Sequence, residues 1–466
     1  MRGHELALSS KRGHSSEAEI CDLDTIVDAI AQVKQLVEAR VPAAGHPLNR
    51  NVTSKSMRKE LVLREAVLLT FCDPTPEESS RLFCLTAKEW ESLLRWLDLS
   101  GLALYFLNRL IELDLCDLLP SAVITRLHLN QIDNSQRTQG MLGESVGIQE
   151  EFQKADLSYA VLKGLSLWPL SVPSLELRSQ FDLDFLVAED SAPEARRILE
   201  RRGYRLYAIS GRSWEFKRNE RPGLSLKHLY KNLPSFAVEL HIEPGVKGVI
   251  SALDRRECRE LRGMKMPVLS PVDLMLGQGL HAFKHTCSEF ARAAHFLEFR
   301  RHVLSRRDDN VFWNDLKCLA ENSSKAATGL GVVTLLITRV MGEFAPEALT
   351  SWTVDHLSRP VRLWVETYAP RVILGSHPGS KLYLLLQNEL ELAGMREKRP
   401  IRRALLPLCL PPSVIRAFPH EGWSVRARRY RMQFELLVAR LGFHLVEGVR
   451  FAVESRRWKR VKELAR

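Results

Sequence analysis

The sequence contains no long hydrophobic run and no closely spaced pair of cysteines. No uncharged apolar stretch reaches the roughly 18 residues that a membrane span needs, and the first residues lack the apolar core of a signal peptide. We therefore expect a cytoplasmic protein. The eight cysteines are scattered, and none forms a Cys-x-x-Cys pair, which argues against a zinc ribbon and against a disulfide framework.

Two further absences narrow the fold class. No internal period of roughly 20–50 residues indicates a solenoid, and no Gly-rich fingerprint indicates a βαβ dinucleotide-binding unit. The composition is 45% hydrophobic and 26% charged, which is typical of globular proteins. The length of 466 residues allows about three domains.

The net charge of +11 is concentrated near the C-terminus, where residues 401–466 hold 15 Lys or Arg against 5 Asp or Glu. Such a basic region suggests an anionic polymer or a membrane surface as partner, and a solvated helix face is an equal alternative. The last helix, at about 424–464, could lie on a membrane from the cytoplasmic side. We favour packing on the protein, with five basic residues exposed: Arg456, Arg457, Lys459, Arg460 and Lys462.

Helical and alternating patterns follow one another along the chain and predict an α+β fold, with a small mixed β-sheet core flanked by N-terminal and C-terminal helical regions. Thr86 and Glu89 form a plausible capping box in the first of these regions. The predicted division is 1–56, a mostly disordered segment with a short helix; 57–155, a helical lead-in domain; 156–269, the α/β core; 270–345, a helical subdomain packing on the core; and 346–466, the basic helical region.

One short segment, 178–187, predicts a buried strand with two carboxylates on one face. Side chains alternate along a strand, so Asp182 and Asp184 point together, away from Phe181, Leu183 and Phe185. Two carboxylates side by side in an apolar setting repel each other, and a bound cation resolves this. Oxygen ligands favour Mg²⁺ or Mn²⁺. An edge strand with both acids in water is the alternative, which the apolar residues between them disfavour.

A second alternating segment, 236–242, carries Glu239 and His241 on one face. If this strand lies beside the first, Glu239 adds a third carboxylate, and such a group can hold two metal ions that clamp an in-line displacement. Upstream, the apolar strand 159–162 ends in Lys163 and Gly164. A turn of this kind offers backbone N–H groups and a cation to a phosphate.

The segments Leu162–Gly164, Leu177–Val187 and Val238–His241 together resemble the uncharacterised nucleotidyltransferase family, which belongs to the polymerase-β-like nucleotidyltransferase superfamily. The similarity covers about residues 61–340. It implies a nucleotidyltransferase core in which Asp182 and Asp184 ligate both Mg²⁺ ions. It also implies that Glu239 ligates the catalytic ion and helps to activate an acceptor hydroxyl.

The resemblance further implies a nucleotide-binding set, made of Lys163, Gly164, Ser166, Arg178, Ser179, His241 and Lys284. Arg178 could steady a phosphate or pair with the acids, and a purely structural ion pair is equally consistent. The usual Gly-Ser turn of the superfamily is here Gly164-Leu165-Ser166, and 17 residues separate Gly164 from Asp182.

His281 and His285 are spaced i, i+4 on a predicted helix, as zinc ligands often are. No Glu follows His281, so the pattern is not His-Glu-x-x-His. We expect a substrate-facing or a buried, hydrogen-bonded role for both. His295 and His302 carry no motif.

The resemblance implies a magnesium-dependent enzyme that binds ATP or another nucleoside triphosphate and transfers its NMP to an unknown hydroxyl acceptor. An Asp-x-Asp glycosyltransferase that uses a nucleotide sugar is one alternative, although its usual βαβ half is missing before the acids. A binding or scaffold protein that kept the fold with weak chemistry is the other.

Overall fold

The computed structural model describes residues 54–218, 229–232, 236–245, 250–261, 263–289, 291–321, 323, 325–376, 379–394 and 423–465. The predicted disordered segment with its short helix, 1–56, therefore lies mostly outside the described residues. The sequence also predicts a strand at 225–229 and a Pro-rich stretch at 400–419, and these lie mostly or wholly outside them too.

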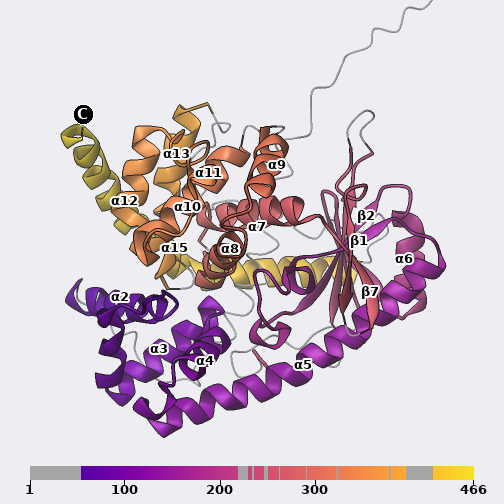
Figure 1. Ribbon diagram of the computed structural model, residues 1–466, viewed down its shortest axis with the longest axis horizontal. Helices are drawn as coiled ribbons and strands as arrows, with labels where there is room; N and C mark the ends of the chain where they lie inside the picture. Colours follow the sequence, from indigo (N-terminus) through magenta and orange to yellow (C-terminus); the bar gives the residue numbers. More distant parts are fainter. Residues whose placement is uncertain are drawn as a thin grey trace, which may run out of the picture.

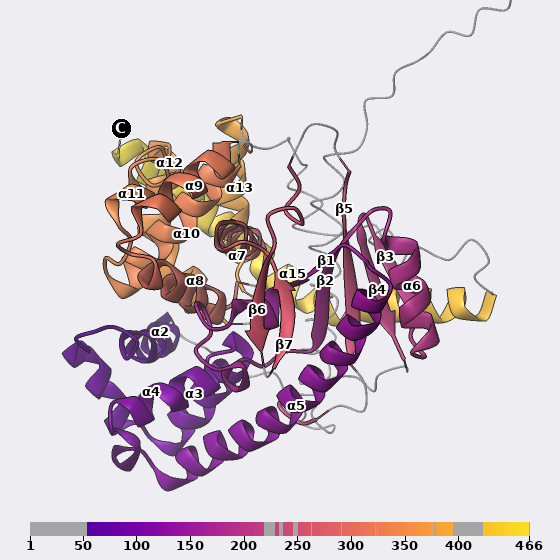
Figure 2. The ribbon, with the colours of Figure 1, turned by 45° about the vertical axis from the view of Figure 1, so that its right-hand side comes forward.

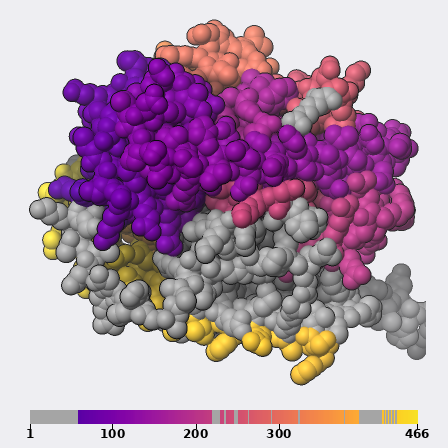
Figure 3. Space-filling view, turned by 90° about the horizontal axis from the view of Figure 1, so that it is seen from below, coloured from indigo at the N-terminus to yellow at the C-terminus, as the bar shows by residue number. Residues whose placement is uncertain are grey.

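The first described elements are four helices: α2 (Ser54–Leu69), α3 (Ala87–Ser100), α4 (Ala103–Glu112) and α5 (Ser121–Lys154). The predicted capping box is confirmed, because the Thr86 hydroxyl accepts from the Glu89 backbone N–H and the Glu89 carboxylate accepts from that of Thr86 at 2.9 Å. Helix α5 runs from this group to the sheet (Figure 1). Seen from below, the indigo-to-purple part of the chain, which includes these helices, forms a continuous band over the upper half of the view (Figure 3).

The core is a mixed sheet with the strand order β3-β4-β5-β2-β1-β7-β6. Strand β2 lies at its centre, parallel to β5 and antiparallel to β1. This confirms the predicted α+β class. The strands are β1 (Tyr159–Leu162), β2 (Asp182–Ala188), β3 (Arg205–Ser210), β4 (Ser213–Lys217), β5 (Ala237–Glu243), β6 (Glu257–Leu261) and β7 (Met264–Val268).

Strand β2 begins at Asp182, four residues later than the sequence suggested. The residues before it follow a short 3-10 helix, η4 (Leu175–Leu177). Polar groups of Arg178 bond to helices rather than to a neighbouring strand. The Asn134 amide of α5 donates to the carbonyl of Arg178 at 3.2 Å, and the Arg178 side chain pairs with Glu298.

One face of the sheet is apolar and covered by helices. Leu183, Phe185 and Val187 of β2 are buried in a cluster with α5 and with α6 (Ala192–Arg201). The rings of Phe152 and Phe185 meet edge to face, 5.5 Å apart. Figure 2 shows α5 and α6 beside the strands. Because the strands alternate, the acidic residues of β2 and β5 lie on the opposite face.

Helices return after the sheet and share a large core with α2–α4 (Figure 1). The first of them begins at Pro271, after a Ser270 hydroxyl that caps the Asp273 N–H. They are α7 (Pro271–Thr286), α8 (Ala293–Ser305), α9 (Asn310–Glu321), α10 (Ala326–Met341), α11 (Glu347–Thr350), α12 (Arg359–Ile373), α13 (Tyr383–Leu392) and α15 (Trp423–Leu464).

The C-terminal part of α15 packs on the protein, as we favoured. The Trp458 indole is buried and donates to the Glu389 carboxylate at 2.8 Å. Lys462 pairs with the same carboxylate at 2.8 Å, so it is half-buried rather than exposed as expected. The other four basic residues named above are exposed. None of the described helices combines the length and apolar character that crossing a membrane requires.

Candidate functional site

The turn after β1 aims a lysine across the polar face of the sheet. Lys163 has a φ of +45°, a left-handed conformation that costs a non-glycine residue of order 1 kcal/mol and gathers at functional sites. The chain then forms the 3-10 helix η3 (Lys163–Leu167), in which the Ser166 hydroxyl donates to the Lys163 carbonyl at 2.8 Å. A side chain at Gly164 would collide with the Gln180 amide. A larger residue at this position would therefore require the Gln180 side chain to move.

Strand register brings two carboxylates together in front of that lysine. Asp184 of β2 and Glu239 of β5 are direct partners in the parallel pairing. The Lys163 ammonium lies 2.8 Å from Asp184 Oδ1 and 3.3 Å from Glu239 Oε2. Sequence reasoning placed the two acids on neighbouring strands, and the structure adds that the ammonium bridges them.

His241, two residues after Glu239 on the same face, completes the group. Its Nε2 lies 3.0 Å from Asp184 Oδ1 and 3.3 Å from Glu239 Oε2. The ligand atoms of Asp184, Glu239 and His241 all lie within 4.8 Å of one another. We call these three residues with Lys163 the acid cluster.

The charged groups of the acid cluster stabilise one another's ionised forms. Burial works to raise the pKa of Glu239, but the charges of Lys163 and His241 outweigh it and keep that pKa well below its usual range. Burial and Lys163 work to lower the pKa of His241, but Glu239 and the hydrogen bond to Asp184 outweigh them and raise it to about 9. Two positive groups thus balance two negative ones.

The donor set of the acid cluster fits a divalent cation. Two carboxylates and an imidazole converge on one space, and the cation that neutralises them in this structure is the Lys163 ammonium. The Lys163 side chain is 37% exposed, against 2% for Asp184. The lysine can therefore turn toward an anionic ligand while the aspartate stays fixed.

Asp182 lies on the same face as Asp184 and is the register partner of Ala237. Among the described residues, it is not part of the compact group of three ligands. Burial works to lower the pKa values of Arg178 and Arg292, and the charge of Asp182 acts on both arginines in the opposite direction. Its predicted role as a metal ligand stays a prediction.

The remaining predicted residues divide between the acid cluster and neighbouring elements. Arg178 pairs with Glu298 of α8 at 3.0 Å, a partner that the sequence did not reveal. The Ser179 hydroxyl donates to the Leu229 carbonyl at 3.3 Å. Lys284 lies in the last turn of α7, and its charge helps to lower the pKa of His281.

Sequence reasoning missed Ser213, whose hydroxyl donates to Glu239 Oε1 at 2.6 Å. Ser213 is the first residue of β4 and is the register partner of His241. The alternating pattern of β4 could have indicated a strand beside β5. It could not indicate which residue of that strand would face Glu239, because register depends on tertiary pairing.

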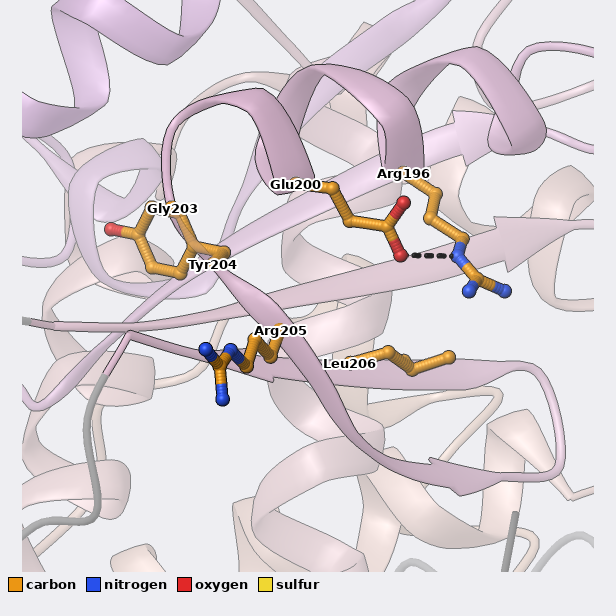
Figure 4. A pocket seen from close by; sticks show the side chains of 6 residues that line it. All are labelled: Arg196, Glu200, Gly203, Tyr204, Arg205 and Leu206. Atoms are coloured by element: carbon orange, nitrogen blue, oxygen red, sulfur yellow. Dashed lines mark hydrogen bonds and ion pairs between the residues drawn. The ribbon is translucent and has the colours of Figure 1, made fainter. Parts of the chain in front are cut away.

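A surface hollow of about 510 Å³ lies where α6 ends and β3 begins (Figure 4). Arg196 and Glu200 form an ion pair of 2.8 Å at its edge. Its lining residues include none of the candidate site residues, and it adds nothing to the site chemistry.

A sequence model for a family described as uncharacterised nucleotidyltransferase matches residues 86–342. The match covers more than half of the chain and includes the whole sheet and the acid cluster. No curated protein matches the chain.

Proposed function

Since the chain belongs to the uncharacterised nucleotidyltransferase family, we propose that it transfers a nucleoside monophosphate from a nucleoside triphosphate to a hydroxyl acceptor, using a divalent cation. The family description supports nucleotidyl transfer in general. The observation that carries the finer proposal is the in-register pair of Asp184 and Glu239 beside Lys163.

The proposed ion is held by the carboxylates of Asp184 and Glu239, with Asp182 and His241 on the same face as further candidate ligands. Oxygen-rich sets favour Mg²⁺, and an imidazole ligand also suits Mn²⁺. An ion at this place would neutralise charge that develops on the transferred phosphoryl group.

Lys163 is proposed to leave the acids when the triphosphate enters and to contact its phosphate oxygens. The backbone of η3 is proposed to contact the same phosphates, since Gly164 and Ser166 belong to the same turn.

In the reaction, the acceptor oxygen bonds to the α-phosphorus and pyrophosphate leaves with the electrons of the broken P–O bond. Glu239 is 20% exposed, against 2% for Asp184, and is the carboxylate better placed to accept the hydroxyl proton.

Calorimetric titration with non-hydrolysable nucleoside triphosphates, with and without Mg²⁺, tests this proposal. Wild type should bind at least one of them in a metal-dependent manner. The double variant Asp184→Asn/Glu239→Gln should bind at least about 10-fold more weakly, a loss of roughly 1.4 kcal/mol. The control is Glu260→Gln, a matched change at an exposed position of β6.

Two results would contradict the proposal. One is that no triphosphate binds to the folded wild type, and the other is equal binding by wild type and by the double variant. Tight binding of a nucleotide sugar in place of the triphosphates would support the glycosyltransferase alternative.

A further inference from the structure

Three histidines converge at the start of the helical subdomain, close to the acid cluster but outside it. His281 and His285 lie one turn apart on α7, and His295 lies in the first turn of α8. Their ring centroids are 4.5, 4.9 and 4.8 Å apart. One ring nitrogen of each lies within 4.8 Å of the others. We call them the histidine cluster.

Two of the three histidines are buried, His281 is half-buried, and one ring nitrogen has no hydrogen-bond partner. His285 and His295 are 4% and 8% exposed. The Nδ1 atom of His295 is buried without a hydrogen-bond partner, and a buried polar atom left in this state destabilises the fold. A ligand at the unpartnered nitrogen would remove that cost.

The residue types suit metal binding. Imidazole nitrogen is a common ligand of zinc and its neighbours, and the bound metal itself keeps the ligating rings neutral. Three imidazoles with an open fourth position form a known arrangement for zinc.

The geometry points to a transition-metal site at His281, His285 and His295, of the Zn²⁺ class, whose fourth ligand is an anion or water. A tetrahedral ion with Zn–N distances of about 2.0–2.1 Å places its ligand atoms roughly 3.4 Å apart. The observed spacing is within 4.8 Å, so metal binding would draw the three nitrogens closer by at most about 1.4 Å.

The surroundings select the fourth ligand. Lys163, Lys284 and Arg178 all act on His281 as positive charges, and Arg292 acts on His295. Glu298 offsets two of these, because it pairs with Arg178 and acts on Arg292. Asp182 also acts on both arginines, and Asp184 and Glu239 pair with Lys163. The cationic side chains that act on the rings favour an anionic fourth ligand, either hydroxide or a phosphate oxygen.

The site differs in chemistry from the acid cluster, and its existence does not rest on the proposed function. Carboxylates favour Mg²⁺ or Mn²⁺, whereas three imidazoles favour zinc and its neighbours. The ion would also tie α7 to α8 across their short connection. A bound metal stabilises the folded state that holds it.

Metal content per chain, measured by mass spectrometry on protein reconstituted with Zn²⁺ and freed of excess, tests the inference. The protein used in this test should be purified with an affinity tag that contains no histidine, so that the tag itself binds no zinc. Wild type should hold about one zinc per chain, and His281→Gln, His285→Gln and His295→Gln should each lose at least about 10-fold in affinity, as ligand loss implies. Cobalt substitution should give the visible absorption of a tetrahedral ion in wild type but not in these three variants.

The controls separate this site from the acid cluster. His302→Gln removes another buried histidine of α8 and should keep the zinc, as should Asp184→Asn/Glu239→Gln. Zinc should also raise the melting temperature of wild type but not of the three cluster variants. The inference is overturned if folded wild type takes up no zinc, or if the cluster variants retain it. Neither result bears on triphosphate binding.

Discussion

The acid cluster and the histidine cluster are neighbours that satisfy their polar groups in opposite ways. In the acid cluster, Lys163 and His241 neutralise Asp184 and Glu239 through contacts of 2.8 to 3.3 Å. In the histidine cluster, the rings of His281 and His295 are neutral, and one buried nitrogen has no partner. The first cluster is complete without an ion, and the second is not.

The difference follows from the elements that carry each cluster. Paired strands fix carboxylates at spacings set by register, and repulsion between the carboxylates must be neutralised for the sheet to form. A helix hairpin can bury imidazoles without charge, because burial favours the neutral, deprotonated form of histidine. The charges of the acid cluster therefore compensate one another, whereas the neutral histidine cluster retains nitrogen atoms that can bind a ligand.

The largest expected effect is that of Asp184→Asn on catalysis. This change keeps the shape of the side chain but removes the least exposed carboxylate of the acid cluster. We expect pyrophosphate release from the preferred triphosphate to fall about 10³-fold, or roughly 4 kcal/mol, which is typical for a lost electrostatic group in an active site. The rate is measured in steady state at saturating Mg²⁺.

The control for this prediction is again Glu260→Gln, which should retain the wild-type rate. His281→Gln is the informative second variant, because it changes the other cluster and leaves the carboxylates intact. A rate for Asp184→Asn within a few-fold of wild type would show that the acid cluster is not catalytic, whatever the metal content of the histidine cluster.

An intermediate effect, about 2 kcal/mol of unfolding free energy, is expected from the titration of His302. This residue tests how burial alone affects a histidine. Like His295, it lies on α8 and is almost fully buried, and its Nδ1 lies 3.2 Å from Gln278 Oε1. Burial lowers its pKa to about 3. Because this folded-state value lies below the unfolded value of about 6.5, stability is full above pH 6.5 and is lost as pH falls toward 3.

Wild type should therefore lose about 2 kcal/mol of unfolding free energy between pH 7 and pH 5 that His302→Gln does not lose. Urea unfolding at both pH values measures the difference. The exposed His356 gives the matched control, since His356→Gln should follow wild type. Parallel curves for wild type and His302→Gln would mean that water reaches this ring, and the argument that burial keeps the histidine cluster neutral would weaken with it.

Much of the acid cluster could be predicted from the sequence because strand alternation is a local property. Leu183 and Phe185 identify the buried face of β2, so the side on which Asp184 lies follows at once. The pairing of β2 with β5 was a hypothesis supported by resemblance. The direction of Lys163 was not predictable, because its left-handed φ is a choice of one backbone torsion.

The histidine cluster could be predicted only in part. The i, i+4 spacing of His281 and His285 was visible, but His295 joins them through the packing of α8 on α7, which no local pattern encodes. Strands β6 and β7 escaped prediction for a related reason. Pro267 in β7 weakens the strand signal, and β7 contacts β1 through one register pair, Val161 with Val268.

The smallest expected effect, about 1 kcal/mol, is that of Lys163→Met on stability, and it tests whether the acid cluster is complete without an ion. Removing the ammonium leaves two carboxylates with His241 as their partner, and the exposure of Lys163 limits the cost to roughly 1 kcal/mol. The same change should enlarge the stabilisation by Mg²⁺, because the ion no longer competes with a bound cation. Thermal unfolding with and without Mg²⁺ measures both, with Lys265→Met at an exposed site of β7 as control. An equal Mg²⁺ response in the two variants would show that lysine and ion do not share this space.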